Sequence, residues 1–218
     1  HRDLHSFPTR RSSDLRLSIG WAGNSMTYID IIDEQDAKGI LKKEYEKGIL
    51  RSGKVFNILK IMSRSPATLR DAMAMYLTIM FGKSDLSRAQ REMLATVVSK
   101  VNHCYYWIEA HGNDFRDEVK DDILAEHLKH DWHKADLSVQ DKSLCLWAEK
   151  LTKTPGEMSK SDITILENAA LSQDAISDAA QVVGYFNYIN RIADGLGVDL
   201  EPEMKWKIQN PPKRESNP

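Results

Sequence analysis

Four residues in one stretch of the chain have the types and spacing for redox or proton-transfer chemistry: Glu92, Cys104, Trp107 and His111. On a helix that begins near Cys104, positions 104, 107 or 108 and 111 share one face. A glutamate on the preceding helix can orient the imidazole and take up its proton, and a helix N-terminus lowers the pKa of a thiol. We therefore expect Glu92, Cys104 and His111 to form a catalytic group with Cys104 as its ionisable sulfur.

Position 107 is where a Cys-x-x-Cys pair that starts at Cys104 would place its second thiol, and it holds tryptophan. Three explanations stay open: a genuine substitution, a single-base read error in a cysteine codon, and a TGA codon for selenocysteine translated as tryptophan. With Trp107 in place, Cys104 would need an external thiol to return it from its oxidised form. His103, Tyr105 and Tyr106 are candidates for the lining of the surrounding pocket.

The composition is that of an ordinary soluble protein, with 41% hydrophobic and 28% charged residues and a formal net charge of -2 over 218 residues. No basic stripe indicates nucleic acid as a partner, and no apolar run approaches the roughly 20 residues that span a bilayer. Two cysteines 41 positions apart indicate a reducing compartment rather than a disulfide scaffold. We expect a cytoplasmic protein that binds neither nucleic acid nor membranes.

Both ends of the chain differ from its middle. Residues 1–25 show no hydrophobic periodicity, and the first fifteen match the translation of a sequencing-adapter oligonucleotide, so we expect a non-native leader with Met26 as the true start. Residues 201–218 hold four of the seven prolines and are expected to form a flexible tail. The folded domain is therefore expected at residues 26–200.

Between these ends the apolar residues recur with helical spacing, and strand signals are almost absent. Ser65-Pro66 predicts a helix start, and Ser87 and Ser138 are further N-cap candidates. The helices are expected at 33–48, 55–62, 66–82, 87–101, 104–115, 117–130, 139–151, 161–169 and 174–196. The sequence therefore predicts one all-α domain.

Several other polar residues are better explained by structure than by chemistry. Cys145 lies in an apolar stretch and is expected to be an inert core thiol. A polar stripe on the last long helix is expected to bond to neighbouring helices; its members are Asn187, Asn190, Arg191 and Asp194. Three histidines stand among charged residues and predict a solvated helix rather than a metal site: His127, His130 and His133. We expect neither a metal nor a cofactor.

The chain resembles the superfamily of AhpD-like alkylhydroperoxidases and carboxymuconolactone decarboxylases, and more narrowly its peroxidase-related branch. The resemblance covers about residues 26–200 and is carried by Leu86-Ser-Arg-Ala-Gln-Arg-Glu-Met93, Val101-Asn-His-Cys104, His111 and Phe186-Asn-Tyr-Ile-Asn-Arg-Ile-Ala-Asp-Gly195. It implies an AhpD-like helical bundle that forms a homo-oligomer. It also implies that Glu92 and His111 relay protons, that Cys104 matches the resolving thiol, and that position 107 is the attacking one. The implied substrates are hydrogen peroxide and organic hydroperoxides, with an external dithiol as reductant.

The missing second thiol leaves three functions open. The leading hypothesis is a peroxidase-related antioxidant oxidoreductase of weak activity. The second is a decarboxylase-like lyase that uses histidine and glutamate without a thiol, for which Arg88, Arg91 and Lys100 are candidate cations for a substrate carboxylate. The third is a non-catalytic oligomeric binding protein, in which Trp107 fills the place of the thiol.

Overall fold

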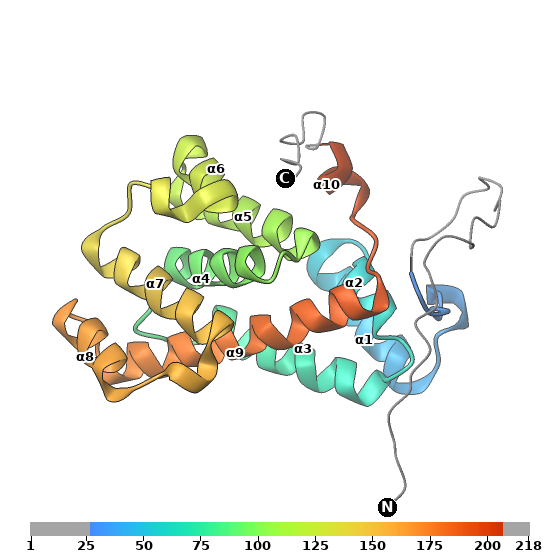
Figure 1. Ribbon diagram of the computed structural model, residues 1–218. Helices are drawn as coiled ribbons and strands as arrows, with labels where there is room; N and C mark the ends of the chain where they lie inside the picture. The colour runs from blue at the N-terminus through green and yellow to red at the C-terminus, as the bar shows by residue number, and fades with distance from the viewer. Residues whose placement is uncertain (1–26, 207–218) are drawn as a thin grey trace, which may run out of the picture.

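Helix α4 (Arg88–Val101) lies at the centre of the fold and packs against α5, α7 and α9 (Figure 1). Every residue from Arg91 to Ser99 is buried, because neighbouring helices cover α4 on all sides. A helix in this position must satisfy each polar side chain with a partner inside the protein, because water cannot reach it. This requirement applies directly to Glu92, which α4 carries into the interior.

The computed structural model describes residues 27–206, and no strand occurs among them, which confirms the all-α single domain. The helices are α1 (Gly39–Ser52), α2 (Asn57–Ile61), α3 (Pro66–Phe81), α4 (Arg88–Val101), α5 (Tyr105–Val119), α6 (Asp122–Asp131), α7 (Val139–Lys153), α8 (Lys160–Asn168), α9 (Gln173–Leu196) and α10 (Pro202–Trp206). None of them has the length and hydropathy that a bilayer crossing requires. The expected leader at 1–25 and the tail beyond 206 lie outside the described residues.

The start of α4 is set by a capping box around Ser87, the residue that the sequence predicted as its N-cap. The Ser87 hydroxyl accepts a hydrogen bond from the Gln90 backbone N–H at 3.1 Å, and the Gln90 side chain accepts one from the Ser87 N–H at 3.0 Å. Ser138 caps α7 in a similar way by accepting from the Asp141 N–H. These local bonds determine where each helix begins, and at α4 they place Glu92 in the second turn.

A tight turn at residues 102–104 reverses the chain between α4 and α5. His103 adopts a left-handed backbone conformation with φ of 59°, and the Cys104 N–H donates to the Ser99 carbonyl at 2.9 Å. Cys104 is then the N-cap of α5, as its position in the sequence suggested. Because α5 returns alongside α4, Glu92 and His111 come to lie next to each other.

Several predicted helix boundaries are wrong. Helix α5 continues past the expected end at 115 to Val119, and Lys120 then takes a left-handed conformation with φ of 58°. Helix α6 consequently begins at Asp122 rather than at 117, with Asp121 as its N-cap. The helix expected at 33–48 also starts late, because residues 34–36 form a short 3-10 turn.

The polar stripe on α9 forms bonds between helices, as predicted. The Asn102 amide donates to Asn187 Oδ1 at 3.1 Å, and the Ser99 hydroxyl donates to Asn190 Oδ1 at 3.2 Å. Both donors belong to α4 or the turn that follows it. These bonds hold α9 against the α4–α5 turn, next to Cys104.

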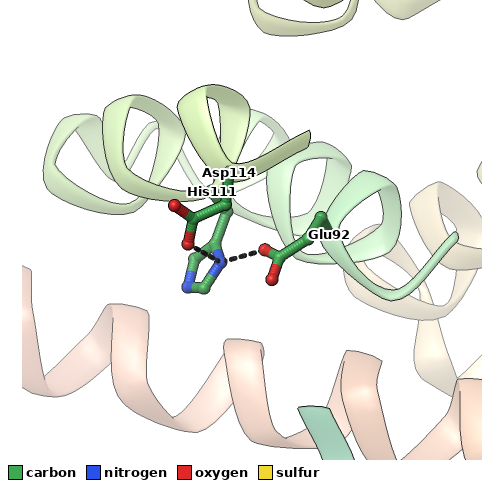
Figure 2. A group of neighbouring side chains, drawn as sticks. All are labelled: Glu92, His111 and Asp114. Atoms are coloured by element: carbon green, nitrogen blue, oxygen red, sulfur yellow. Dashed lines mark hydrogen bonds and ion pairs between the residues drawn. The ribbon is translucent and has the colours of Figure 1, made fainter. Parts of the chain in front are cut away.

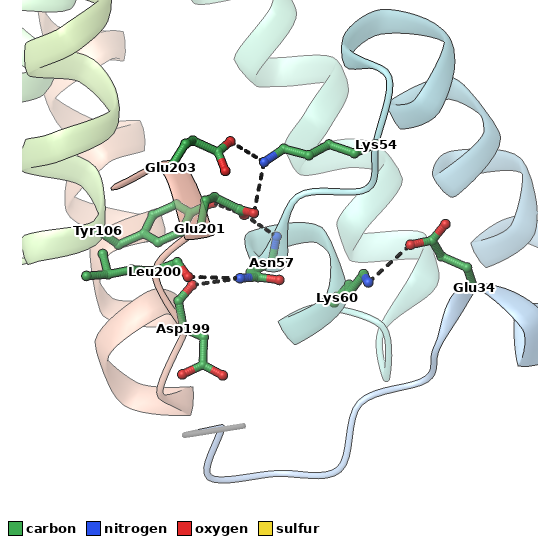
Figure 3. A network of polar contacts seen from close by, with 9 residues as sticks. All are labelled: Glu34, Lys54, Asn57, Lys60, Tyr106, Asp199, Leu200, Glu201 and Glu203. Carbon is green, nitrogen blue, oxygen red and sulfur yellow. Dashed lines mark hydrogen bonds and ion pairs between the residues drawn. The ribbon is translucent and has the colours of Figure 1, made fainter. Parts of the chain in front are cut away.

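The segment after α9 continues into the short helix α10 (Pro202–Trp206), where the sequence predicted a flexible tail. Glu201 is 3% exposed, and its carboxylate accepts from the Asn57 N–H at 2.6 Å and from the Tyr106 hydroxyl at 3.1 Å (Figure 3). Lys54 forms ion pairs with both Glu201 and Glu203. These long-range contacts hold α10 against α2 and α5, which proline content alone does not predict.

We predict that Glu201→Ala lowers the free energy of unfolding by about 2 kcal/mol, because it leaves the Asn57 N–H and the Tyr106 hydroxyl buried without an acceptor. Urea unfolding followed by circular dichroism measures the loss. Glu203→Ala is the matched control, because Glu203 is 61% exposed and forms its ion pair with Lys54 at the surface, so its loss should stay below about 1 kcal/mol. Equal losses for the two variants would contradict the anchoring role of Glu201.

Candidate active site

Glu92 and His111 form a hydrogen-bonded pair in the protein interior (Figure 2). His111 Nδ1 and Glu92 Oε2 are 2.5 Å apart, and the two side chains are 1% and 0% exposed. With Nδ1 bonded to the carboxylate, Nε2 of the neutral ring carries the lone pair. The pairing predicted from sequence between this acid and this imidazole is therefore present in the structure.

Arg88 completes the pairing of the buried carboxylate. Its Nε donates to Glu92 Oε1 at 2.6 Å, one helical turn before Glu92, and its guanidinium lies over the Phe81 ring, 3.7 Å from the centroid. Burial by itself would raise the pKa of Glu92, but His111 and Arg88 together outweigh burial, so that pKa is lowered. Glu92 is therefore ionised at neutral pH and holds the imidazole in one orientation.

Asp114 adds a second carboxylate on the same side of α5. Its Oδ2 lies 3.8 Å from His111 Nδ1, and together with Glu92 and His111 it forms a group of potential metal ligands. Arg88 already supplies a positive charge to Glu92, and the close contact of Nδ1 with Glu92 is that of a hydrogen bond. A metal ion would have to displace both the Arg88 guanidinium and the Glu92–His111 hydrogen bond. The arrangement therefore fits an acid–base pair better than a metal site.

Aromatic rings enclose the imidazole. Trp107 stacks on His111 at 5.1 Å between centroids and 19° between planes, and Phe186 meets it edge-on at 4.6 Å. Tyr76 of α3 lies 6.2 Å away. Trp107 itself packs edge-on against Phe186 and Tyr106. Trp107 thus occupies the place next to the histidine as a packed ring, on the face of α5 where the sequence predicted a site.

A cavity of about 820 Å³ lies beside these rings and includes Trp107 and His111 in its wall. Most of the wall is apolar, and its larger side chains include Met73, Tyr76, Leu77, Phe81, Tyr185 and Ile189. Pockets of this size and character accept small organic molecules. Sequence reasoning missed the contributions of α3 and α9, because neither helix is near the motif in the chain.

Cys104 does not have the properties expected of the reactive thiol. Its side chain is 0% exposed, and its sulfur lies 3.9 Å from the Asn190 carbonyl oxygen. Burial, with a smaller contribution from Asp194, raises the pKa of the thiol far above its ordinary value. The N–H groups at the start of α5 do lower that pKa, as predicted, but burial outweighs them. This burial opposes the expectation that Cys104 is the ionisable sulfur of the group, and a reactive thiol at Cys104 stays a prediction.

The remaining candidates are divided between the cavity and the surface. Tyr106 lines the cavity, while His103 and Tyr105 are exposed and do not. The candidate cations Arg88, Arg91 and Lys100 do not line it either. Arg91 donates instead to backbone carbonyls at the end of α3. Two arginines that sequence reasoning missed, Arg51 and Arg116, are in the cavity wall.

Comparison with solved structures identifies the class of fold. An uncharacterized peroxidase-related protein from Silicibacter sp. TM1040 is 30% identical, with a TM-score of 0.76 over 85% of this chain and 97% of its own. The alkylhydroperoxidase AhpD core protein of Ralstonia eutropha JMP134 is 21% identical, with a TM-score of 0.77 over 83% and 95%. A variant of the debrominase Bmp8 in complex with 2,3,4-tribromopyrrole is 14% identical, with a TM-score of 0.69 over 85% and 97%. No family model matches the chain.

The helical fold is therefore that of the AhpD core. The chain belongs to the peroxidase-related group of the AhpD-like superfamily, as its motifs indicated. Within that fold, it combines the Glu92–His111 pair with a tryptophan at position 107 and a buried Cys104.

We predict that the folded protein reacts very slowly with thiol reagents such as 5,5′-dithiobis(2-nitrobenzoic acid). Burial raises the pKa of both Cys104 and Cys145, so both remain protonated and covered across pH 6–9. Guanidinium-denatured protein is the control, and it should release two equivalents of dye within minutes. Rapid release of one equivalent from the folded protein at pH 7 would show an exposed thiolate and contradict this description of Cys104.

Proposed function

We propose that this protein is an enzyme that moves protons on an apolar, ring-bearing small molecule, with His111 as general base and acid and Glu92 as the residue that orients it. The carrying observation is the hydrogen bond between Glu92 and His111 at the wall of a large apolar cavity that neither cysteine lines. The proposal develops the thiol-independent lyase hypothesis rather than the peroxidase hypothesis.

The geometry of the pair supports this chemistry. A carboxylate that holds Nδ1 fixes the orientation of the imidazole, so that Nε2 is the ring nitrogen placed to take up a proton and to return it. The Nε2 atom has no hydrogen-bond partner among the described residues. Arg88 donates to the other carboxylate oxygen of Glu92, and His111 and Arg88 together lower the pKa of Glu92.

The cavity supports an apolar substrate. Aromatic side chains from α3, α5 and α9 contribute to its wall, and such walls favour planar rings through stacked and edge-on contacts. The debrominase with the same fold binds a brominated pyrrole, which is a small planar ring of the size that this cavity accepts. That likeness concerns the fold and the shape of the ligand, and the reaction at His111 is argued from this chain's own residues.

The test is exchange of carbon-bound hydrogen for deuterium, measured by NMR in D₂O with 2-indanone and phenylacetone. The base removes a proton next to the carbonyl, and the enolate takes a deuteron back from solvent. We predict exchange above the buffer rate, a loss of about 10²- to 10⁴-fold in His111→Gln and Glu92→Gln, and no change in Cys104→Ser.

Glu109→Gln is the matched control for the exchange test. Glu109 is a buried carboxylate like Glu92, but it lies on α5 and pairs with Lys129 outside the cavity. It should exchange like the original protein. If no form exceeds the buffer rate while circular dichroism shows intact helices, the acid–base proposal is lost and a non-catalytic binding protein becomes the better description.

The second candidate function is the thiol peroxidase predicted from the motif. It is favoured by the peroxidase-related structure at 30% identity and by the position of Cys104 at the start of α5. The burial of Cys104 and the tryptophan at position 107 oppose it. Activity on peroxides, an external dithiol partner, a homo-oligomer and a cytoplasmic location stay predictions.

We predict that Trp107→Cys gains oxidation of dithiothreitol that depends on cumene hydroperoxide, because it restores a second thiol one helical turn from Cys104. Trp107→Ser is the control, since it removes the indole ring without adding a thiol. The rate is followed as loss of hydroperoxide. A Trp107→Cys variant no faster than Trp107→Ser would exclude a latent thiol peroxidase. If the unsubstituted protein already consumes hydroperoxide and Cys104→Ser abolishes that activity, peroxidase chemistry is favoured over acid–base chemistry.

A further inference from the structure

Two stacked rings in the cavity wall carry polar atoms that no described residue satisfies. Trp107 is 8% exposed and His111 is 1% exposed, and neither Trp107 Nε1 nor His111 Nε2 has a hydrogen-bond partner among the described residues. An unpartnered buried donor or acceptor costs about 1–3 kcal/mol, and native proteins keep few of them. Two such atoms on adjacent cavity-lining side chains indicate a ligand group that bonds to both.

The chemistry of the two atoms limits what that group can be. The indole N–H only donates. His111 Nε2 accepts in the tautomer that places the ring proton on Nδ1, next to the Glu92 carboxylate. A group that accepts from one nitrogen and donates to the other is a hydroxyl, whereas a hydrocarbon does neither and an ether oxygen cannot donate.

The surroundings of the pair define the rest of the ligand. Tyr76, Phe81 and Tyr185 contribute to an apolar wall, which fits an uncharged aromatic ring. We propose that the cavity binds phenols, with the ring among these side chains and the hydroxyl accepting from Trp107 Nε1 and donating to His111 Nε2. Both nitrogens are covered, so this binding mode requires the indole ring to shift, and a change in tryptophan fluorescence is its expected signal.

This inference rests on the proposed acid–base site, but it concerns binding rather than turnover. The hydroxyl proton faces the atom that acts as base, so a bound phenol is placed for proton transfer to His111. Trp107 is the positioning residue in this arrangement, and its contribution is the indole N–H rather than the size of the ring alone.

The test compares 4-methylphenol with toluene on the full chain, by isothermal titration calorimetry and tryptophan fluorescence. These probes share a ring and a methyl group and differ in the hydroxyl. We expect 4-methylphenol to bind about 2- to 10-fold more tightly than toluene, as one added net hydrogen bond allows. Trp107→Phe should abolish this preference and leave toluene binding within about 2-fold.

Trp147→Phe is the matched control, because Trp147 is also buried, its Nε1 also has no partner among the described residues, and it lies outside the cavity wall. It should keep the preference for 4-methylphenol. Equal affinity of the original protein for both probes, binding of neither, or equal effects of the two tryptophan variants would overturn the proposal. A preserved preference without deuterium exchange would leave phenol binding intact and reject only the proposed catalysis.

Discussion

The structure depends on one buried interaction, the hydrogen bond between Glu92 of α4 and His111 of α5. A carboxylate with no exposed surface is stable only when other groups compensate its charge. His111 does so from the neighbouring helix and Arg88 from the preceding turn. The pair therefore ties the centre of the fold to the cavity wall, and the same contact that satisfies the buried charge also orients a base.

Burial has opposite outcomes for the charged forms of Glu92 and Cys104. Glu92 is buried with two partners and stays ionised, so it can support His111. Cys104 is buried against the Asn190 carbonyl and near Asp194, and neither of these stabilises a thiolate. The start of α5 does act on the thiol in the expected direction, but a helix terminus cannot compensate for the loss of water around a charged sulfur.

Trp107 changes the character of the site more than any other residue. A thiol at this position would be small and polar, whereas the indole stacks on His111 and packs edge-on against Phe186 and Tyr106. These contacts fill the space beside the histidine and give the cavity wall an aromatic surface. Chemistry at this wall consequently depends on the imidazole and on which ligands fit against the aromatic rings.

Much of the fold could be predicted from the sequence, because helix starts and apolar periodicity are encoded within a few residues. The caps at Ser87 and Ser138 and the polar stripe on α9 follow from such local patterns. The end of α5 could not be predicted in this way, because Lys120 adopts a left-handed conformation at a position where no glycine signals it. The short helix after α9 could not be predicted from local patterns either, because Glu201 is held by partners far away in the chain.

For the site, the sequence by itself determined which acid and which imidazole face each other, because the spacing around one tight turn brings Glu92 and His111 together. Only the tertiary structure decided that Cys104 is buried, which raises the pKa of its thiol, that α3 and α9 complete an apolar cavity, and that the indole of Trp107 stacks on His111. The physical reason is that solvent access and local dielectric are properties of all the helices packed around a group. The residues beside that group in the chain do not specify them.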